Sequence, residues 1–304
     1  MTESYADLTA VVLNFQTPDL TERSVRALIA DGIPPERVVV VDNASGDASV
    51  ERFERAFPES VVLALPDNGG FATGNNAGAA RLPGSAYLFV NSDAFAEPGA
   101  LSALAHRLET SQADLVVPRL LDEDRTLQPN VVPRTSLARE LVRGAGIGLV
   151  LRHPSWSTHW DHADARPVDC AIGAVLLIRH EAWIELGGFD ERRFMYAEDL
   201  DLFWRARERR LRTWFEPAAE FVHLGSGTAG RRWSPAARAD AVAEAEGEMI
   251  RAHLTRSTAL LTLGVMAAGT CMRAVVRAAL GQREQSAALA AFTRGYLRQA
   301  IAKR

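Results

Sequence analysis

The sequence predicts an α/β protein in which a doubly wound, mostly parallel sheet is flanked by helices and followed by a C-terminal helical extension. The apolar runs 38–41 and 87–90 lead directly into the polar residues Asp42 and Asn91. Such short apolar runs are typical of strands buried on both faces. Segments with helical spacing alternate with them, and 47% of the 304 residues are hydrophobic, enough for a large core.

The first 120 residues alternate regularly between the two kinds of element. Strands are predicted at 8–13, 37–42, 60–65, 87–91 and 115–117. Helices are predicted at 20–30, 48–57, 70–80 and 98–110. The last begins with Pro98 near its first turn, a position that proline favours. This order predicts a sheet with helices on both faces.

The pattern changes between about 120 and 167, a stretch of irregular chain typical of a functional excursion or a mobile loop. Further elements are predicted as a strand at 171–178, a helix at 181–186, a turn at 187–190, an acidic helix at 198–208 and a strand at 212–215 leading to His223.

The tail from 236 onward is predicted to be helical and contains an uncharged apolar segment, 257–272. This segment is shorter than the roughly 20 residues that span a bilayer. Arginines flank it, so a membrane-docking helix hairpin is one interpretation. A buried helix or an oligomer contact is the other.

Charge and cysteine content exclude several classes of protein. The net charge of −4 provides no basic field, so nucleic-acid binding is not expected. Cys170 and Cys271 lie far apart and form no metal-binding pattern, which favours a reducing cytosol. The first seven residues contain acids where a signal peptide needs basic residues and an apolar core. We therefore expect a cytoplasmic protein.

Polar residues follow the predicted strands at the edge where open α/β sheets bind ligands. Asp42 can accept hydrogen bonds from a ribose hydroxyl or a pyrimidine N–H. Its alternative role is to form an Asx turn before the next helix, whose N-cap residue would be Ser45 or Asp47. Asp93 offers the carboxylate oxygen that Mg²⁺ prefers, together with substrate phosphates.

The stretch 68–76 has neither the GxGxxG spacing of dinucleotide-binding proteins nor the GK[ST] of a P-loop. NAD enzymes and P-loop NTPases are therefore not expected. Its glycines permit close approach of backbone to a ligand, and Asn75 and Asn76 offer amide groups to hydroxyls. A plain turn at a helix N-terminus is the alternative.

Two acids begin the predicted helix 198–208. Helical spacing gathers Glu198 and Asp201 on a polar, solvent-facing side and leaves Asp199 on the flank of the apolar face. An early helix position is expected to lower the pKa of Asp199 and keep it ionised. We predict that Asp199 is a general base and that Glu198 assists it.

Taken in order, the motifs resemble those of the GT-A glycosyltransferases of family 2, particularly a rhamnosyltransferase-like branch. The resemblance covers about 8–227. It is carried by Val-Val-Leu-Asn-Phe at 11–15, Val-Asp-Asn-Ala-Ser-Gly-Asp at 41–47, Asn-Gly-Gly-Phe-Ala-Thr-Gly-Asn-Asn at 68–76, Phe-Val-Asn-Ser-Asp at 89–93, Gly-Gly-Phe-Asp at 187–190 and Glu-Asp-Leu-Asp-Leu-Phe-Trp-Arg at 198–205.

The resemblance implies a site for a nucleotide sugar and a divalent cation, Mg²⁺ or Mn²⁺. The DxD position of the family falls at 91–93, where Asn91 replaces the first acid, so Asp93 and His223 are the expected metal ligands. The residues expected to bind the donor are Asn14, Asp42, Asn43, Asn68, Gly70, Asn75, Asn91, Asp93 and Arg232.

Two further segments are assigned roles beside this site. The glycines at 225–230 precede Arg231, Arg232 and Trp233, which would form a lid over a diphosphate or an ordinary surface loop. Rings in the irregular segment would form a platform for the acceptor. They are His153, Trp156, His159, Trp160 and His162.

The resulting expectation is an inverting, metal-dependent glycosyltransferase that moves one sugar, such as rhamnose from dTDP-rhamnose, to a cell-surface glycan or lipid-linked acceptor. A non-catalytic nucleotide-sugar-binding module and a sugar-phosphate nucleotidyltransferase are the alternatives. The expected domains are 1–235, with a donor-binding half at 1–120 and a catalytic half at 121–235, and an extension at 236–304 that docks to the inner face of the plasma membrane or forms a homodimer.

Overall fold

The computed structural model describes residues 7–144, 158, 160–225 and 234–302. The chain divides into two compact units. The first comprises 1–131 and 162–228, and the second comprises 132–161 and 229–304. This division differs from the expected domains in assigning 132–161 to the unit that contains the C-terminal helices.

A ten-stranded sheet forms the first unit, with its longest path in the order β3-β2-β1-β4-β11-β6-β12-β5. Its strands are β1 (Leu8–Asn14), β2 (Val38–Asp42), β3 (Val61–Ala64), β4 (Ala86–Asn91), β5 (Ala94–Ala96), β6 (Leu115–Leu121), β7 (Leu127–Gln128), β9 (Arg166–Val168), β11 (Val175–Arg179) and β12 (Thr213–His223). Two further short strands are β8 (Val131–Val132) and β10 (Cys170–Ala171).

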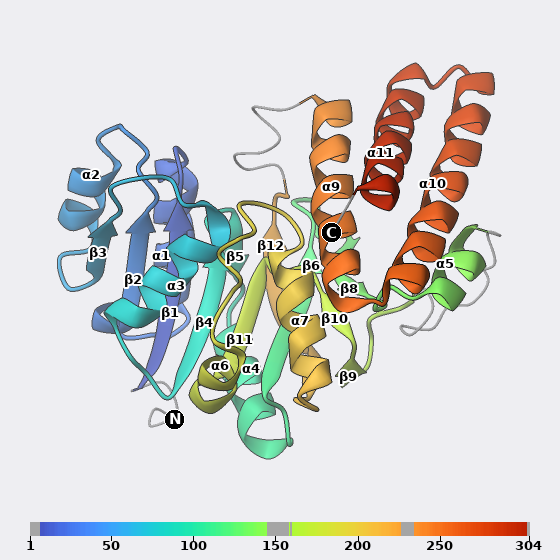
Figure 1. The fold of residues 1–304 in the computed structure, drawn as a ribbon. Helices are drawn as coiled ribbons and strands as arrows, with labels where there is room; N and C mark the ends of the chain where they lie inside the picture. Colours follow the sequence, from blue (N-terminus) through green and yellow to red (C-terminus); the bar gives the residue numbers. More distant parts are fainter. Residues whose placement is uncertain (1–6, 145–157, 159, 226–233, 303–304) are drawn as a thin grey trace. The chain divides into compact units, whose positions relative to one another are not determined.

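The predicted α/β class is confirmed, because β3, β2, β1 and β4 pair in parallel and lie side by side in Figure 1. β11 lies between β4 and β6 and pairs antiparallel with both strands. β5 is the last strand of this order and pairs antiparallel with β12. The sheet is therefore mixed beyond β4.

Helices cover both faces of this sheet (Figure 1). Those of the first unit are α1 (Pro18–Ala30), α2 (Ser49–Ala56), α3 (Gly70–Arg81), α4 (Ala100–Thr110), α6 (His180–Leu186) and α7 (Glu198–Glu208), with a 3-10 turn at Pro35–Arg37. Leu28 of α1 and Leu104 of α4 pack with Val12 and Val40 in the main core. On the other face, Gly78 of α3 lies against Val11, because alternate strand residues point to opposite faces.

In the described residues of the second unit, the helices are α5 (Leu137–Gly144), α9 (Pro235–His253), α10 (Arg256–Ala279) and α11 (Arg283–Ile301). α10 and α11 form the predicted helical hairpin. Close contact between α9 and α11 depends on small residues, since a Cβ on Gly295 would lie 2.5 Å from the Cβ of Ala243.

By length and composition alone α10 could cross a membrane, a test that core helices of soluble proteins also pass.

Two predicted strands differ from the structure. The predicted strand 171–178 is two strands, β10 and β11, interrupted at 172–174, where Gly173 N–H bonds to the side chain of Asp199 instead of to a neighbouring strand. The strand predicted at 212–215 continues as β12 to His223, with a bulge between Glu216 and Glu220.

Candidate active site

Three predicted site residues end neighbouring parallel strands. Asn14 ends β1 opposite Asp42 of β2, and Asn91 ends β4 opposite Leu13 of β1. The register therefore brings these polar side chains to one edge of the sheet, as the sequence predicted. Asp93 follows two residues after Asn91, immediately before β5.

Asp42 is held by a closed network of hydrogen bonds. Its Oδ1 accepts bonds from Asn14 Nδ2 at 2.6 Å and Ser45 Oγ at 2.6 Å, and its Oδ2 accepts the Ser45 N–H at 3.0 Å. Asn14 Oδ1 in turn accepts the Thr21 hydroxyl at 2.8 Å. The Asx turn that was the alternative role for Asp42 is therefore present, although Ala48, not Ser45 or Asp47, is the N-cap residue of α2. A bond from Asp42 to a nucleotide stays a prediction.

Asn43 connects the end of β2 to the turn before α3. Its Nδ2 donates to Asn68 Oδ1 at 2.9 Å and to the Gly70 carbonyl at 3.1 Å, while its Oδ1 accepts the Gly69 N–H at 3.2 Å. A Cβ on Gly70, whose φ is +86°, would lie 2.1 Å from the Phe194 carbonyl oxygen. The close approach that Gly70 permits in this structure is thus to the protein's own backbone.

The two asparagines of α3 have different partners. Asn75 is buried, and its Nδ2 donates to the Phe71 carbonyl one turn earlier at 3.0 Å. Asn76 Nδ2 donates to the Phe189 carbonyl at 2.9 Å, and its Oδ1 accepts the Phe189 N–H at 2.9 Å. Asn76 therefore fixes the Gly-Gly-Phe-Asp turn, a structural role that the sequence did not indicate.

Asp93 and His223, which are far apart in the sequence, are brought together by the pairing of two strands in the first unit. β5 pairs antiparallel with β12 so that His223 lies opposite Ala94. His223 Nε2 lies 3.3 Å from Asp93 Oδ1, and both residues are buried. The two residues expected to bind a metal therefore lie next to each other, and metal binding by them stays a prediction. Within the described residues, no group of three or more His, Cys, Asp or Glu side chains is placed to bind a metal.

The start of α7 has an unusual backbone. Tyr196 and Ala197, which immediately precede Glu198, have φ values of 70° and 61°. Such left-handed conformations in residues other than glycine are costly and cluster at functional sites. They turn the chain sharply so that the first turn of α7 begins with Glu198 and Asp199.

Asp199 is held by two backbone donors. Its Oδ2 accepts the Gly173 N–H at 2.7 Å, and its Oδ1 accepts the Leu200 N–H at 2.7 Å. A Cβ on Gly173 would lie 2.6 Å from the Cβ of Asp199, so only glycine fits this approach. Although Asp199 keeps some exposed surface, protein atoms surround its carboxylate, and this burial raises its pKa. The predicted lowering by the helix N-terminus is wrong, because the cost of desolvation exceeds the effect of the N–H groups.

Glu198 is also buried, and its Oε2 has no hydrogen-bond partner among the described residues. Burial, together with the neighbouring Asp199 charge, raises the pKa of Glu198 to about 8. Arg193 opposes this shift. Because a charge on Asp199 raises the pKa of Glu198, the two acids titrate as a coupled pair in which charge on one disfavours charge on the other.

The predicted solvent-facing side of α7 is wrong for Glu198 and Asp201. Asp201 is buried and accepts bonds from Arg193 at 3.3 Å and from Arg205 at 2.7 Å. Arg205 also donates to the carbonyls of Leu186 and Gly188. Helical spacing located the polar face correctly, but the loop 186–193 covers it.

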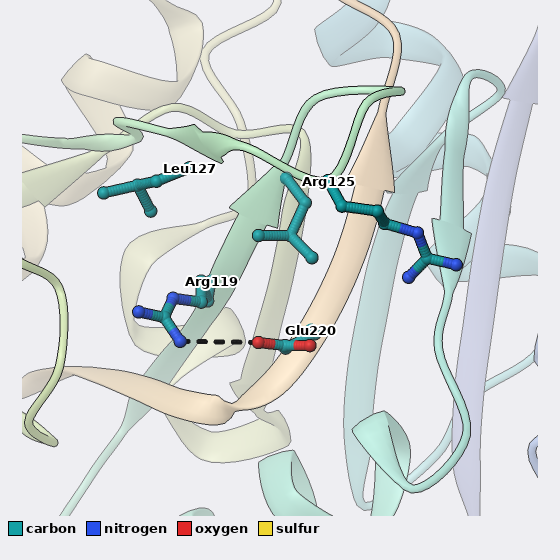
Figure 2. A pocket seen from close by; sticks show the side chains of 5 residues that line it. Arg119, Arg125, Leu127 and Glu220 are labelled. Carbon is teal, nitrogen blue, oxygen red and sulfur yellow. Dashed lines mark hydrogen bonds and ion pairs between the residues drawn. The ribbon is translucent and has the colours of Figure 1, made fainter.

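A cavity of about 420 Å³ lies on β6, β7 and β12 of the first unit (Figure 2). Its lining residues are Arg119, Leu121, Arg125, Leu127 and Glu220. Arg119 forms an ion pair with Glu220 at 3.4 Å, and Arg125 with Glu97 at 2.6 Å. None of the predicted site residues lines this cavity.

Several predictions concern the irregular segments. Trp160 and His162 are buried, and the His162 ring packs edge-on against Phe215. These two rings therefore do not form the exposed acceptor platform that was expected. Other residues assigned to the platform or the lid lie outside the described residues. They are His153, Trp156, His159, Arg231, Arg232 and Trp233.

Sequence reasoning missed three residues of the site, namely Gly173, Arg193 and Gln128. Gly173 and Arg193 contact the acids of α7, and Gln128 contacts His223 at 2.6 Å. Gly173 and Gln128 are distant in sequence from the residues that they contact, whereas Arg193 lies eight residues before Asp201, and none of the three belongs to a recognisable motif. The residues before α7 gave no signal either, because positive φ values at Tyr196 and Ala197 are not indicated by residue type.

Comparison with solved structures identifies the class of the fold. The mannosyltransferase PcManGT from Pyrobaculum calidifontis, solved with GDP-Man and Mn²⁺, matches with a TM-score of 0.59 and 17% identity, over 96% of this chain and 87% of that one. GalNAc-T7, solved with UDP, GalNAc and Mn²⁺, matches with a TM-score of 0.55 and 13% identity, over 73% of this chain and 44% of that one. The protein thus has the GT-A fold of glycosyltransferases.

Sequence comparison identifies the family. The model of glycosyl transferase family 2 matches residues 9–183. The match covers more than half of the chain, so the protein belongs to glycosyl transferase family 2 and is a glycosyltransferase.

Curated relatives support a rhamnosyltransferase-like position within that family. The N-acetylglucosaminyl-diphospho-decaprenol L-rhamnosyltransferase of Mycobacterium tuberculosis is 28% identical over 74% of this chain and 78% of its own length. The pre-mycofactocin glycosyltransferase of the same organism is 29% identical over 62% of this chain and 37% of its own length. The predicted family resemblance is confirmed.

Proposed function

We propose that this glycosyltransferase moves one sugar from a nucleoside-diphosphate donor, with inversion, to a cell-surface glycan or lipid-linked acceptor. The observation that carries the proposal is the pair Glu198–Asp199, in which burial raises both pKa values and the Gly173 N–H donates to the Asp199 carboxylate. A base whose pKa is raised toward neutral removes a proton from a hydroxyl more effectively than an ordinary carboxylate. The mycobacterial relative, an L-rhamnosyltransferase, supports rhamnose from dTDP-rhamnose as the donor to test first.

Asp93 and His223 fit a divalent cation. A carboxylate oxygen and an imidazole nitrogen face each other at 3.3 Å, close enough to bind one ion, and the donor diphosphate would supply further oxygens. Two structural neighbours were solved with Mn²⁺. When bound, Mg²⁺ or Mn²⁺ would neutralise charge on the departing diphosphate.

The protein's own residues then account for the remaining chemistry. The acceptor hydroxyl oxygen forms a bond to the anomeric carbon as the bond to the diphosphate oxygen breaks, and its proton passes to Asp199. Glu198 keeps its own proton and limits the negative charge beside the base. Asn14, Asp42, Asn43, Asn68, Gly70, Asn75, Asn91 and Arg232 remain the proposed contacts to the donor.

The first test of this function is a panel of dTDP-, UDP- and GDP-sugars with purified protein, with and without Mg²⁺ or Mn²⁺. Metal-dependent release of one nucleoside diphosphate, dependent on acceptor, is the expected result. Failure to bind any nucleotide sugar in the presence of metal would contradict the proposal and favour a non-catalytic module.

A second part of the proposal concerns 236–304, for which we favour peripheral contact with an anionic membrane at the cytoplasmic face. Leu261, Met272 and Val275 lie on one face of α10 and are exposed. The segment 256–304 contains one acid, Glu284, although the whole chain has a net charge of −4. Its basic residues are Arg256, Arg273, Arg277, Arg283, Arg294, Arg298, Lys303 and Arg304. An anionic surface matches this composition better than a second copy of the same segment.

Vesicle sedimentation tests this contact. The protein is expected to bind vesicles that contain phosphatidylglycerol more strongly than vesicles of phosphatidylcholine alone, and Val275→Glu is expected to weaken binding. Ile184→Glu, at an equally exposed apolar residue of α6 in the first unit, is the matched control. A dimer in light scattering that Val275→Glu dissociates, without vesicle binding, would favour the homodimer instead.

A further inference from the structure

The orientation of the Gln128 side chain is determined by its acceptors. Gln128 Nε2 lies 2.7 Å from Asp122 Oδ1 and 3.0 Å from the His223 carbonyl oxygen. Both of these atoms only accept hydrogen bonds when the carboxylate is ionised, so the amide nitrogen must face them. The amide oxygen of Gln128 is therefore the atom that faces His223 Nδ1, at 2.6 Å.

This orientation determines the tautomer of the His223 ring. Because Gln128 Oε1 can only accept, Nδ1 of His223 must carry a hydrogen and donate it. In the neutral ring, Nε2 then has its lone pair directed toward Asp93 Oδ1, 3.3 Å away. Two electron-rich atoms at that separation favour a cation between them.

We propose that Gln128 is a positioning residue that presents Nε2 of His223 to the divalent cation, with Asp122 fixing the Gln128 amide. The inference rests on the proposed metal-binding function of Asp93 and His223. An outer hydrogen-bond partner of this kind sets the tautomer and orientation of a metal-binding histidine. Nothing in the sequence motifs assigns a role to Gln128.

The strand geometry supports this role. Leu127 and Gln128 form β7, which pairs with β6 so that Leu127 lies opposite Leu121 and Gln128 opposite Leu120. Successive side chains of a strand point to opposite faces. Leu127 accordingly lines the cavity of Figure 2, while Gln128 is directed to His223. The hairpin formed by β6 and β7 thus holds the amide against the end of β12.

The test is Mn²⁺ affinity, measured by electron paramagnetic resonance with Mn²⁺ alone and with Mn²⁺ plus dTDP or UDP. Gln128→Leu removes the acceptor while keeping a similar volume, and Mn²⁺ affinity is expected to fall about 10- to 100-fold. Gln128→Glu keeps an acceptor for Nδ1–H but sets its second oxygen against Asp122 and the His223 carbonyl, so its affinity is expected to lie between those of wild type and Gln128→Leu. Gln112→Leu, at an exposed glutamine between α4 and β6, is the matched control.

A second readout reports the tautomer directly. Nitrogen-15 spectra of the metal-free protein at a pH where the ring is neutral are expected to show His223 protonated at Nδ1. In Gln128→Leu the ring is expected to shift toward the Nε2-protonated form. A structural role alone would lower the melting temperature without changing either the tautomer or the Mn²⁺ affinity.

The outcomes separate this inference from the function on which it rests. If the wild-type protein and His223→Ala bind Mn²⁺ equally weakly, the metal-binding proposal is wrong. If the wild-type protein binds Mn²⁺ and His223→Ala does not, but Gln128→Leu binds as tightly as wild type, the metal site stands and the role of Gln128 is overturned.

Discussion

Asp42 at the end of β2 and Glu198 at the start of α7 are both buried carboxylates, yet the protein surrounds them differently. Asp42 accepts three hydrogen bonds, from Asn14 and twice from Ser45. Glu198 has an Oε2 without a partner in the described part of the chain, and burial raises its pKa to about 8. Hydrogen bonds to both oxygens fix the Asp42 carboxylate in place, whereas burial with one unbonded oxygen favours the protonated form of Glu198. The strand-end network therefore stabilises the fold, and the α7 acids retain the capacity to exchange a proton.

The largest expected effect is that of Asp199→Asn. If the α7 acids carry out the chemistry, the rate of sugar transfer should fall roughly 10²- to 10⁴-fold, because an amide cannot accept the hydroxyl proton. Donor and Mn²⁺ binding should persist, since Asp93 and His223 are unchanged. The measurement is the initial rate at saturating donor and acceptor beside the donor dissociation constant. A variant that keeps more than about a tenth of the rate would assign the base elsewhere.

The next effect concerns how stability depends on pH. The pKa of Glu198 is about 8 in the folded protein and is 4.5 for the unperturbed side chain. Between these values the folded state holds a proton that the unfolded chain releases, so this group makes the protein less stable as pH rises from about 4.5 to about 8. Glu198→Gln, which resembles the protonated acid, should remove that dependence.

The measurement is thermal unfolding of both proteins at pH 5 and pH 8. The stability advantage of Glu198→Gln should be small at pH 5 and on the order of a few kcal/mol at pH 8. Equal advantages at the two pH values would show that Glu198 is not protonated in the folded protein, and the contrast with Asp42 would be lost.

A smaller effect is expected from Gly173→Ala, which tests whether the loop 172–174 positions Asp199. The new Cβ would lie 2.6 Å from the Asp199 Cβ, so the loop or the acid must move. Displacement of a reacting group by an ångström costs up to about 100-fold in rate, so we expect a 10- to 100-fold lower kcat with unchanged Mn²⁺ affinity. Gly264→Ala in α10, where a Cβ meets nothing within 4 Å, is the matched control. A rate within two-fold of wild type would show that the loop does not position the base.

The two regions also differ in how far the sequence predicts them. β1, β2 and β4 were predictable because each is a local apolar run, and their polar ends follow from the same pattern. The proximity of Asp93 and His223 was expected from the family motifs, while the metal-binding role that these motifs imply stays a prediction. The antiparallel entry of β11 was not, because strand pairing depends on contacts between residues far apart in sequence.

The environment of α7 was the part that sequence reasoning misjudged. Helical periodicity places Glu198 and Asp201 on one side but does not reveal that Arg193, Arg205 and the loop 186–193 cover that side. The pKa of a carboxylate depends on this covering more than on its position in the helix. The sequence therefore predicted the wrong direction for the pKa shift of Asp199, and the observed direction follows from the packing around it.

The smallest effect is expected from Ser45→Ala, which tests the hydrogen-bond network around Asp42. Ser45 Oγ accepts the Gln16 N–H at 2.9 Å and the Asn14 amide at 3.0 Å, and it donates to Asp42. Ser45→Ala leaves these buried groups short of a partner and should cost about 1–3 kcal/mol in unfolding free energy. Ser60→Ala, which removes one hydroxyl bond to the Pro35 carbonyl, is the control and should cost about 1 kcal/mol or less. Denaturant unfolding measures both. If Ser45→Ala were no more destabilising than Ser60→Ala, the network around Asp42 would not stabilise the fold, and the distinction between a structural carboxylate and a reactive one would have to rest on Glu198 alone.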